Sequence, residues 1–362
     1  MLWKILESQS ILINAERRIG KTQVLRKMLL EPLEGWNPIF RDLENIHSAQ
    51  EFAEQVYNDV QEHLGTVKRA TGFLRKFFED NETKYVNIKE RSWKELLKSA
   101  VEDLMKTKAQ KRLVFFWDEI PYMLESIRKK DGPEMAAEVL DTIRSLRVEQ
   151  AEFRVIFTGS IGLHHILGKL ASAGIPTSAK NDMYAVTVTP LAPVDGERLA
   201  KDLMAGEEVG SENPASAAAV IADEVDYFPF YIHHVIAGLK MDEIAATEDN
   251  VREYVARQLV DAADPWQIAH YRTRIATYYP DNDDAYKVEG ILDVLAQTSD
   301  STTVSQILEL ANTQGVQVTD RNDLLRLLRL LDADHYLTRE NDGSYRFRFT
   351  LIRRWWKLDR GL

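Results

Sequence analysis

The chain has 362 residues, no cysteine and a formal net charge of -11 at pH 7. This length is sufficient for two or three domains with a substantial buried core. The lack of cysteine excludes disulfides and thiolate metal sites, and the acidic balance argues against broad electrostatic attraction to nucleic acid. Because there is no apolar run of about 18 residues and no signal-peptide pattern, we expect a cytoplasmic protein without a membrane partner.

The first informative stretch is a charged loop at residues 15–22. An apolar run at residues 10–14 precedes it, and apolar residues recur every three or four positions over residues 23–30, so the pattern predicts a strand, a loop and a helix. Backbone N–H groups of such a loop, together with the helix N-terminus, form a phosphate cradle. We expect Lys21 to reach the β- and γ-phosphates of a nucleotide and Thr22 to bind Mg²⁺ through its hydroxyl.

The loop follows the pattern G-x-x-x-x-G-K-[ST] except at its first position, where Ala15 replaces glycine. Alanine permits a tight turn, but a positive φ would be costly at that position. The alternative interpretation is a chance G-K-T in a charged loop. The residues expected to bind the nucleotide are Ala15, Arg17, Arg18, Ile19, Gly20, Lys21 and Thr22.

An acidic pair about a hundred residues later provides the second signal. Five apolar residues at 113–117 predict a strand buried on both faces, as in a parallel sheet. Asp118 and Glu119 then follow at its C-terminal end, where ligands bind in open α/β sheets. We expect Asp118 to hold Mg²⁺ and Glu119 to act as the general base toward water. The loop and this pair should meet at one edge of one sheet.

The remaining pattern up to residue 192 completes an α/β core. Further strands are predicted at residues 38–44, 153–160 and 184–191, which with the two strands above make a five-stranded parallel sheet in a three-layer fold. Helices are predicted at residues 1–7, 48–64, 93–106 and 134–147. Pro121 is expected to turn the chain away after the acidic pair.

The end of the strand at residues 153–160 carries another candidate for the site. In P-loop ATPases with a strand inserted between the two motifs, a polar residue here contacts the attacking water or the γ-phosphate. Ser160 is the catalytic candidate, with Thr158 beside it as the alternative. Ser160 is equally suited to be a helix N-cap, and the two roles are compatible.

Two other patterns have a functional and a structural interpretation. Residues 65–89 interleave basic and aromatic side chains, which suits single-stranded nucleic acid but also an amphipathic surface helix, the interpretation we favour. The pairs His164–His165 and His233–His234 suggest metal ligands. Because adjacent helical residues point about 100° apart, neither pair is expected to chelate a metal by itself.

The composition changes after residue 192. Alanine-rich helices predict a helical lid, and the last part predicts three helices followed by a hairpin built on Asp342 and Gly343, as in a winged helix. The expected domains are a P-loop ATPase core at 1–192, a helical lid domain at 193–284 and a winged-helix domain at 285–362. Arginines of the last region suit DNA, or, as we favour because aspartates alternate with them, a protein surface. They are Arg321, Arg326, Arg329, Arg346, Arg348, Arg353 and Arg354.

The segments R-R-I-G-K-T, D-E-I-P and T-G-S, at residues 17–22, 118–121 and 158–160, resemble those of AAA-type P-loop ATPases of the archaeal and bacterial STAND-like group. This resemblance covers nearly the whole chain. It implies binding of ATP with Mg²⁺, slow hydrolysis, a helical lid, a C-terminal winged helix and switching linked to a protein partner or to assembly. The motifs identify no arginine finger or lid sensor; Arg272 and Arg274 are candidates, and a surface helix explains them equally well.

Three functions follow as hypotheses. The first is an ATP-hydrolysing switch that couples its nucleotide state to a protein partner or a homo-oligomer. The second is a winged-helix DNA-binding regulator whose ATPase core controls the oligomeric state. The third is a scaffold that holds its nucleotide without hydrolysing it.

Overall fold

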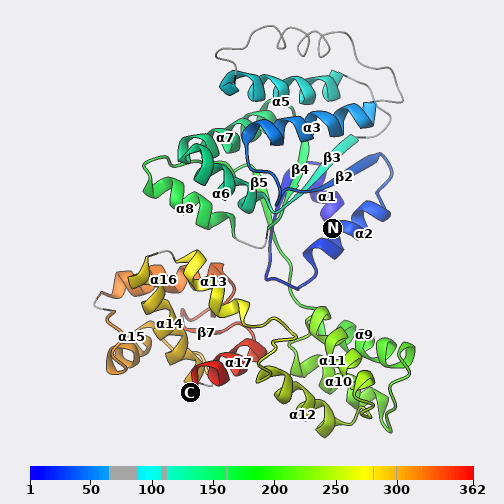
Figure 1. Cartoon of the computed structure of the whole chain (residues 1–362), viewed down its shortest axis with the longest axis vertical. Helices are drawn as coiled ribbons and strands as arrows, with labels where there is room; N and C mark the ends of the chain where they lie inside the picture. Colours follow the sequence, from blue (N-terminus) through cyan, green and yellow to red (C-terminus); the bar gives the residue numbers. More distant parts are fainter. Residues whose placement is uncertain (65–88, 107–111, 160–161, 280, 299, 319) are drawn as a thin grey trace. The chain divides into compact units, whose positions relative to one another are not determined.

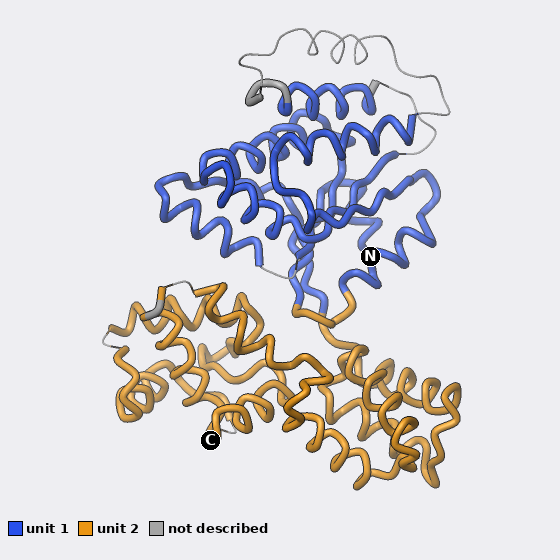
Figure 2. Tube along the Cα trace, viewed as in Figure 1, with its two compact units in different colours: residues 1–15, 21–188 blue, residues 16–20, 189–362 orange. Residues whose placement is uncertain are grey.

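The computed structural model describes residues 1–64, 89–106, 112–159, 162–279, 281–298, 300–318 and 320–362 (Figure 1). They form two compact units (Figure 2). Unit 1 comprises residues 1–15 and 21–188, and unit 2 comprises residues 16–20 and 189–362. The middle of the predicted phosphate loop therefore groups with the C-terminal part of the chain. Ser160 and all but the last residue of the basic and aromatic segment at 65–89 lie outside the described residues.

Unit 1 contains a five-stranded parallel sheet with the strand order β2-β3-β4-β1-β5. The strands are β1 (Ser10–Asn14), β2 (Trp36–Asp42), β3 (Arg112–Asp118), β4 (Arg154–Phe157) and β5 (Met183–Thr187). Strand β4 lies between β1 and β3, so the strand before the loop and the strand before the acidic pair are separated by one strand. Pro38 lies in β2, which is an edge strand and therefore tolerates a residue without an N–H. The predicted parallel sheet is confirmed.

Helices cover both faces of this sheet (Figure 1). They are α1 (Leu2–Leu6), α2 (Lys21–Leu30), α3 (Ala49–Leu64), α5 (Lys89–Lys106), α6 (Ile120–Asp131), α7 (Pro133–Glu149) and α8 (Leu163–Ser172). Alternate residues of β3 belong to two different hydrophobic clusters. Val114 and Phe116 pack with α1 and α2, whereas Phe115 and Trp117 pack with the other helices of unit 1. The three-layer α/β fold predicted from the sequence is therefore confirmed.

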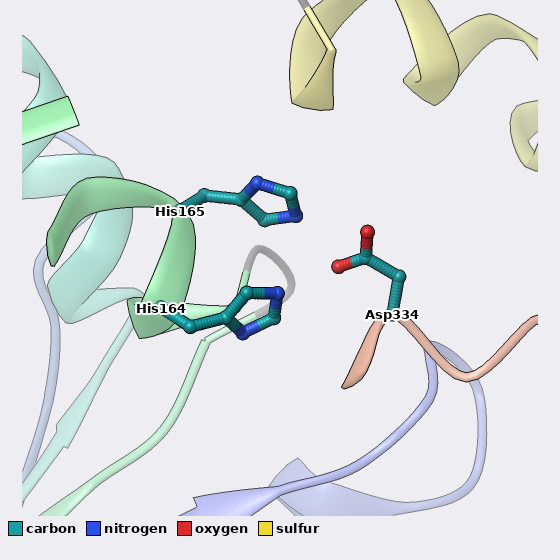
Figure 3. Close-up of side chains that lie close together, drawn as sticks. All are labelled: His164, His165 and Asp334. Atoms are coloured by element: carbon teal, nitrogen blue, oxygen red, sulfur yellow. The ribbon is translucent and has the colours of Figure 1, made fainter. Parts of the chain in front are cut away.

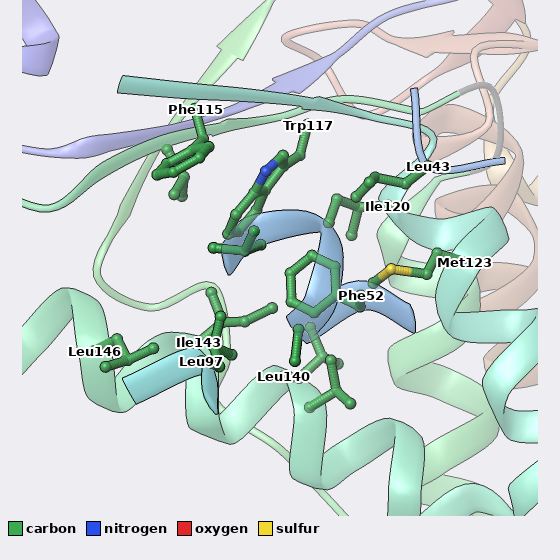
Figure 4. Close-up of a cluster of buried hydrophobic side chains, with 14 of the residues drawn as sticks. Leu43, Phe52, Leu97, Phe115, Trp117, Ile120, Met123, Leu140, Ile143 and Leu146 are labelled. Carbon is green, nitrogen blue, oxygen red and sulfur yellow. The ribbon is translucent and has the colours of Figure 1, made fainter. Parts of the chain in front are cut away.

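The larger cluster contains aromatic side chains of β3, among them Trp117, the residue before the acidic pair (Figure 4). Trp117 is 1% exposed, and its ring lies 5.1 Å from that of Phe52, 5.3 Å from Phe115 and 5.9 Å from Phe157, measured between centroids. Aromatic pairs at this separation add to the free energy gained by burial. The residue before Asp118 is thus held by α3 and by two neighbouring strand positions, which restricts where the carboxylate lies.

Helices α6 and α17 (Thr350–Arg360) lie where the sequence analysis predicted no helix. Helix α6 begins at Ile120, so Pro121 does not turn the chain away but lies in the first turn of a helix, where its missing N–H has no intrahelical acceptor to lose. Helix α17 follows the hairpin and carries Arg353 and Arg354, which the sequence analysis placed near the wing. Its buried residues, Leu351, Ile352, Trp355 and Trp356, recur at helical spacing, a signal that was available in the sequence.

Unit 2 is mostly helical. Its elements are α9 (Pro193–Gly206), α10 (Pro214–Glu224), α11 (Pro229–Met241), α12 (Glu248–Leu259), α13 (His270–Tyr278), α14 (Asn282–Gln297), α15 (Val304–Thr313), α16 (Arg321–Ala333), β6 (Leu337–Arg339), β7 (Tyr345–Phe347) and α17. Three helices and an antiparallel hairpin follow one another in the predicted order. The winged-helix assignment and the three domain boundaries stay predictions. Among the described residues, no helix has both the length and the apolar composition needed to cross a membrane.

Two carboxylates, those of Asp226 and Glu224, join the end of α10 and the turn after it to the last helix of unit 2. Asp226, in the turn between α10 and α11, accepts a hydrogen bond from the N–H of Leu351 at 2.6 Å in the first turn of α17. The neighbouring Glu224 pairs with Arg354 of α17. Burial raises the pKa of Asp226 to about 6, because it outweighs the hydrogen bonds from the N–H groups of Leu351 and Thr350.

This raised pKa predicts a pH-dependent stability of unit 2. A carboxyl whose pKa is higher in the folded state than in the unfolded state costs stability once it ionises, so the cost grows as the pH rises from about 4 through about 6. We expect Asp226→Asn to be more stable than the wild type at pH 7, on the order of 1–2 kcal/mol given partial exposure to solvent, and equal near pH 4. Calorimetric melting of both proteins between pH 4 and 8 tests this; parallel pH profiles would contradict it.

Candidate functional site

The carboxylate of Asp118 is held by two threonine hydroxyls at the C-terminal edge of the sheet. Thr22, in the first turn of α2, donates to Oδ2 at 3.2 Å, and Thr158, directly after β4, donates to Oδ1. The N–H of Glu119 also donates to Oδ1, at 3.1 Å. Asp118 is 7% exposed and Thr158 is 1% exposed. The expectation that the lysine-threonine turn and the acidic pair meet at one sheet edge is therefore confirmed.

Lys21 begins α2 and is buried, with 8% of its surface exposed. Its Nζ donates to the carbonyl oxygen of Ala15 at 2.8 Å, across the mouth of the loop. A buried ammonium is costly unless it is hydrogen-bonded, so this lysine is kept at the loop by its contacts. The first four N–H groups of α2 have no intrahelical acceptor and carry the positive end of the helix dipole. Together they make this end of α2 suitable for an anion.

Glu119 has a left-handed backbone conformation, with φ 58° and ψ 31°, at the N-cap of α6. Such a conformation costs a non-glycine residue about 1 kcal/mol or more and persists where surrounding structure enforces it. Glu119 is the single residue between the end of β3 and the start of α6. It follows Asp118 directly and is half-buried. Strain at a residue of this type is typical of functional sites.

The loop at residues 16–20 contains two residues with a positive φ. Arg18 has φ 64° and Gly20 has φ 104°, whereas the residue before each of them does not have a positive φ. Positive-φ residues at alternate positions are typical of loops whose successive N–H groups bind an anion. Ala15 does not have a positive φ. The alanine in place of the expected glycine therefore carries no backbone strain.

Within unit 2, the loop is bound by a buried ion pair. Arg274 of α13 donates from two guanidinium nitrogens to Glu16, at 2.7 and 3.2 Å, and the two side chains are 8% and 1% exposed. Burial by itself would raise the pKa of Glu16, but the positive charge and hydrogen bonds of Arg274, with His335 nearby, hold it below its ordinary value. Glu16 is therefore a carboxylate at neutral pH.

A second contact of the loop within unit 2 involves Arg18. Its guanidinium donates to the carbonyl oxygen of Trp266 and, at 2.6 Å, to Oε1 of Gln267. It also lies over the ring of Phe230, 4.6 Å from the centroid, an attractive arrangement for a cation. Arg18 was predicted to bind the nucleotide, but its side chain is occupied by these contacts. Arg17 is exposed.

The histidine pairs behave differently from each other. His164 and His165 begin α8, and their rings lie 4.3 Å apart between centroids (Figure 3). The ring of His164 folds over Gly162, where a Cβ would lie 2.3 Å from it, so glycine makes this conformation possible. The sequence analysis expected the side chains of His164 and His165 to point apart. It did not consider that the ring of His164 could lie over Gly162. His233 and His234 lie on α11, beside a shallow surface cavity of about 180 Å³.

The arginines proposed as a DNA or protein surface are largely paired within unit 2. Arg326 binds Asp284 at 2.6 Å and Asp323 at 2.7 Å, and Arg346 binds Glu340 at 2.6 Å. The other contacts join Arg321 to Ser305, Arg348 to His335, Arg353 to the carbonyl oxygen of Thr298 and Arg354 to Glu224. The carboxylates paired with Arg326, Arg346 and Arg354 weaken the attraction of these three guanidiniums for phosphates, which does not favour the DNA interpretation.

The donor set at Asp118 fits a magnesium ion. A carboxylate oxygen of Asp118 and the hydroxyl oxygen of Thr22 lie 3.2 Å apart at the N-terminal end of α2. Mg²⁺ prefers hard oxygen ligands of this kind and usually keeps several water ligands. The sequence analysis assigned the metal to the same two residues. It did not name Glu16 as a site residue, and it named Arg274 only as a possible position. No motif links these two positions, which are 258 residues apart in the sequence.

Neither a protein-family model nor a curated protein matches the sequence. Among solved structures, the chain is similar to the Walker-type ATPase PABY2304 of Pyrococcus abyssi, with a TM-score of 0.62 and 16% identity over 98% of this chain and 93% of that chain. It is also similar to the ORC2 protein of Aeropyrum pernix in ADPNP-ADP complexes, with a TM-score of 0.53 and 13% identity over 99% and 89%. The chain therefore has the fold of P-loop ATPases, with an α/β core and a helical C-terminal region.

The hydrogen bond from Thr158 to Asp118 predicts a stability effect. In Thr158→Val the shape is kept, but the buried carboxylate loses a donor, so we expect the free energy of unfolding to fall by about 1–3 kcal/mol. Urea denaturation measures it. Thr187→Val, at an exposed position of β5, is the control and should change stability by no more than about 0.5 kcal/mol. Equal losses in the two variants would contradict the assignment.

Proposed function

We propose that this chain is a Mg²⁺-dependent ATPase that works as a nucleotide-driven switch for a protein partner or for a homo-oligomer. The observation that carries the proposal is the group formed by Lys21, Thr22, Asp118 and Thr158 at the C-terminal sheet edge. The fold shared with the Walker-type ATPase supports it. The ORC2 protein was solved with ADPNP and ADP, which supports adenine nucleotides as the ligands.

Each residue has a role in the proposed hydrolysis. The loop N–H groups and the start of α2 hold the phosphates, and Lys21 places its positive charge on the β- and γ-phosphates. Glu119 orients a water molecule and accepts its proton while the water oxygen bonds to the γ-phosphorus and the bond to the ADP oxygen breaks. Thr158, which contacts Asp118, takes the polar position at the end of β4 beside Ser160.

Thr22 and Asp118 would hold the magnesium ion, Asp118 through the water shell of the ion. When bound, the ion neutralises charge that develops on the phosphate oxygens. In this structure Thr22 donates its hydroxyl hydrogen to Asp118. The hydroxyl oxygen also has lone pairs, so it could bind the metal either with this hydrogen bond kept or with the hydrogen turned away. Both arrangements keep the two side chains adjacent.

The alternative, a DNA-binding regulator, has less support from the contacts. It requires binding of duplex DNA that weakens steeply with salt. Three of the seven arginines that would serve it, Arg326, Arg346 and Arg354, are paired with carboxylates of the same unit. A protein surface, in which charges of both signs alternate, fits this pattern better.

The first test concerns the phosphate-binding lysine. We expect Lys21→Ala to weaken the binding of a fluorescent ADP analogue by about 100-fold or more, because a charge-assisted contact to the phosphates is lost. Lys27→Ala is the matched control, since Lys27 lies on the same helix with 73% of its side chain exposed and pairs only with solvent-exposed Glu31. Unchanged affinity in Lys21→Ala would contradict the proposed site.

The second test concerns the general base. We expect Glu119→Gln to lower kcat for ATP hydrolysis by about 10²–10⁴-fold and to leave ATP affinity within a few-fold, so that ATP stays bound. Single-turnover hydrolysis of radiolabelled ATP and a binding titration separate the two quantities. Glu125→Gln on α6 serves as the control. Turnover at the wild-type rate in Glu119→Gln would remove Glu119 from the base role.

A further inference from the structure

The residues that hold the phosphate loop come from far along the chain. Within unit 2, Glu16 and Arg18 of the loop contact Trp266, Gln267 and Arg274. Residues 16–20 therefore group with unit 2, although β1 before them and α2 after them belong to unit 1 (Figure 2). The backbone of residues 16–20 continues into β1 and α2, and the side chains of Glu16 and Arg18 bind residues of unit 2. Both sets of connections therefore determine the conformation of the loop.

The guanidinium of Arg274 is held in place by several hydrogen bonds. Its Nε donates to the hydroxyl of Tyr336 at 2.8 Å, and one terminal nitrogen donates to the carbonyl oxygen of Asp334 at 3.0 Å, in addition to the two bonds to Glu16. The guanidinium lies over the rings of Tyr336 and Tyr271, 4.3 and 4.5 Å from the centroids. With these hydrogen bonds made in a buried site, the side chain has little freedom to move.

Glu16 transmits this position to the loop backbone. Its Oε1, which accepts from Arg274, also accepts from the N–H of Arg17 at 2.7 Å. The same carboxylate thus joins α13 to the turn that leads into the left-handed residues Arg18 and Gly20. Those two residues have the positive φ that is typical of anion-binding loops, so the position of Arg274 determines how the loop is held.

We propose that Arg274 is a positioning residue for the phosphate loop, and that it sets nucleotide affinity by acting through Glu16 rather than by contacting a phosphate. This inference rests on the proposed function of the loop. Holding the loop in its binding conformation lowers the entropy cost of binding. Because coupling between two sites is reciprocal, nucleotide binding would in turn stabilise the contacts of α13 with the region around Tyr336.

The experiment is a double-mutant cycle with Glu16→Gln, Arg274→Gln and the double variant, measured by titration with a fluorescent ADP analogue. We expect each single variant to weaken binding by about 10-fold, and the double variant to be no weaker than the weaker single one, because both remove the same contact. At saturating ATP, kcat should stay within about 3-fold, since Lys21 and Glu119 are unchanged. Arg272→Gln, on the same helix and paired with Asp359, is the control and should bind as the wild type.

A second measurement does not depend on the nucleotide. Trypsin cleaves after arginine, and Arg17 and Arg18 lie in the loop, so release of the loop should speed cleavage after these residues in Glu16→Gln and Arg274→Gln but not in Arg272→Gln. Mass spectrometry of the N-terminal fragment records it. If wild type binds no nucleotide, the proposed function fails, while this cleavage pattern still tests the contact between Arg274 and Glu16. If Arg274→Gln does not fold, Glu16→Gln, which keeps the shape of the side chain, carries both measurements.

The proposal is overturned by either of two results. One is unchanged or tighter nucleotide binding in Glu16→Gln with wild-type cleavage of the loop. The other is additive losses in the double variant, which would mean that the two residues act on the nucleotide independently.

Discussion

The site depends on the position of one buried carboxylate. Asp118 ends a strand that is buried on both faces, and the hydroxyls of Thr22 and Thr158 bind its two oxygens. This arrangement requires the C-terminal ends of parallel strands to meet at one edge, with β4 beside β3 and β1 on the other side of β4. Trp117, directly before the carboxylate, packs against the rings of Phe52, Phe115 and Phe157, which restricts where the carboxylate lies.

The predicted phosphate loop is divided between the two units. Its ends continue β1 and α2 of unit 1, whereas Glu16 and Arg18 make their contacts within unit 2. Among these contacts, the ion pair with Arg274 is buried, and Arg274 donates four hydrogen bonds, so removal of one partner would leave an uncompensated charge. The proposed nucleotide-driven switch would need a connection of this kind between its nucleotide loop and its C-terminal helices.

Several arginines of unit 2 are paired with carboxylates of the same unit. Among those that the sequence suggested as a nucleic-acid surface, Arg326 binds Asp284 on α14 and Asp323 on its own helix, Arg346 binds Glu340 and Arg354 binds Glu224. The chain as a whole has a net charge of -11. Both observations favour a protein partner over a nucleic acid for this region.

The local sequence pattern predicted much of the fold and of the candidate site. Alternating and continuous apolar runs predicted the five strands, and helical spacing predicted most helices, because side-chain periodicity reports directly which face is buried. The G-K-T turn and the Asp118–Glu119 pair identified the candidate site before any contact was known. Helix α6 was missed because proline was interpreted as a breaker, although a helix accepts it in its first turn.

Contacts between residues that are distant in the sequence became known only from the tertiary structure. The bond between Glu16 and Arg274 joins positions 258 residues apart, and no periodicity or motif encodes such a pairing. It also showed that Ala15 needs no positive φ and that Thr158 reaches Asp118. The physical reason is that periodicity records whether a side chain is buried, whereas the partner of a buried charge is chosen by how the whole chain packs.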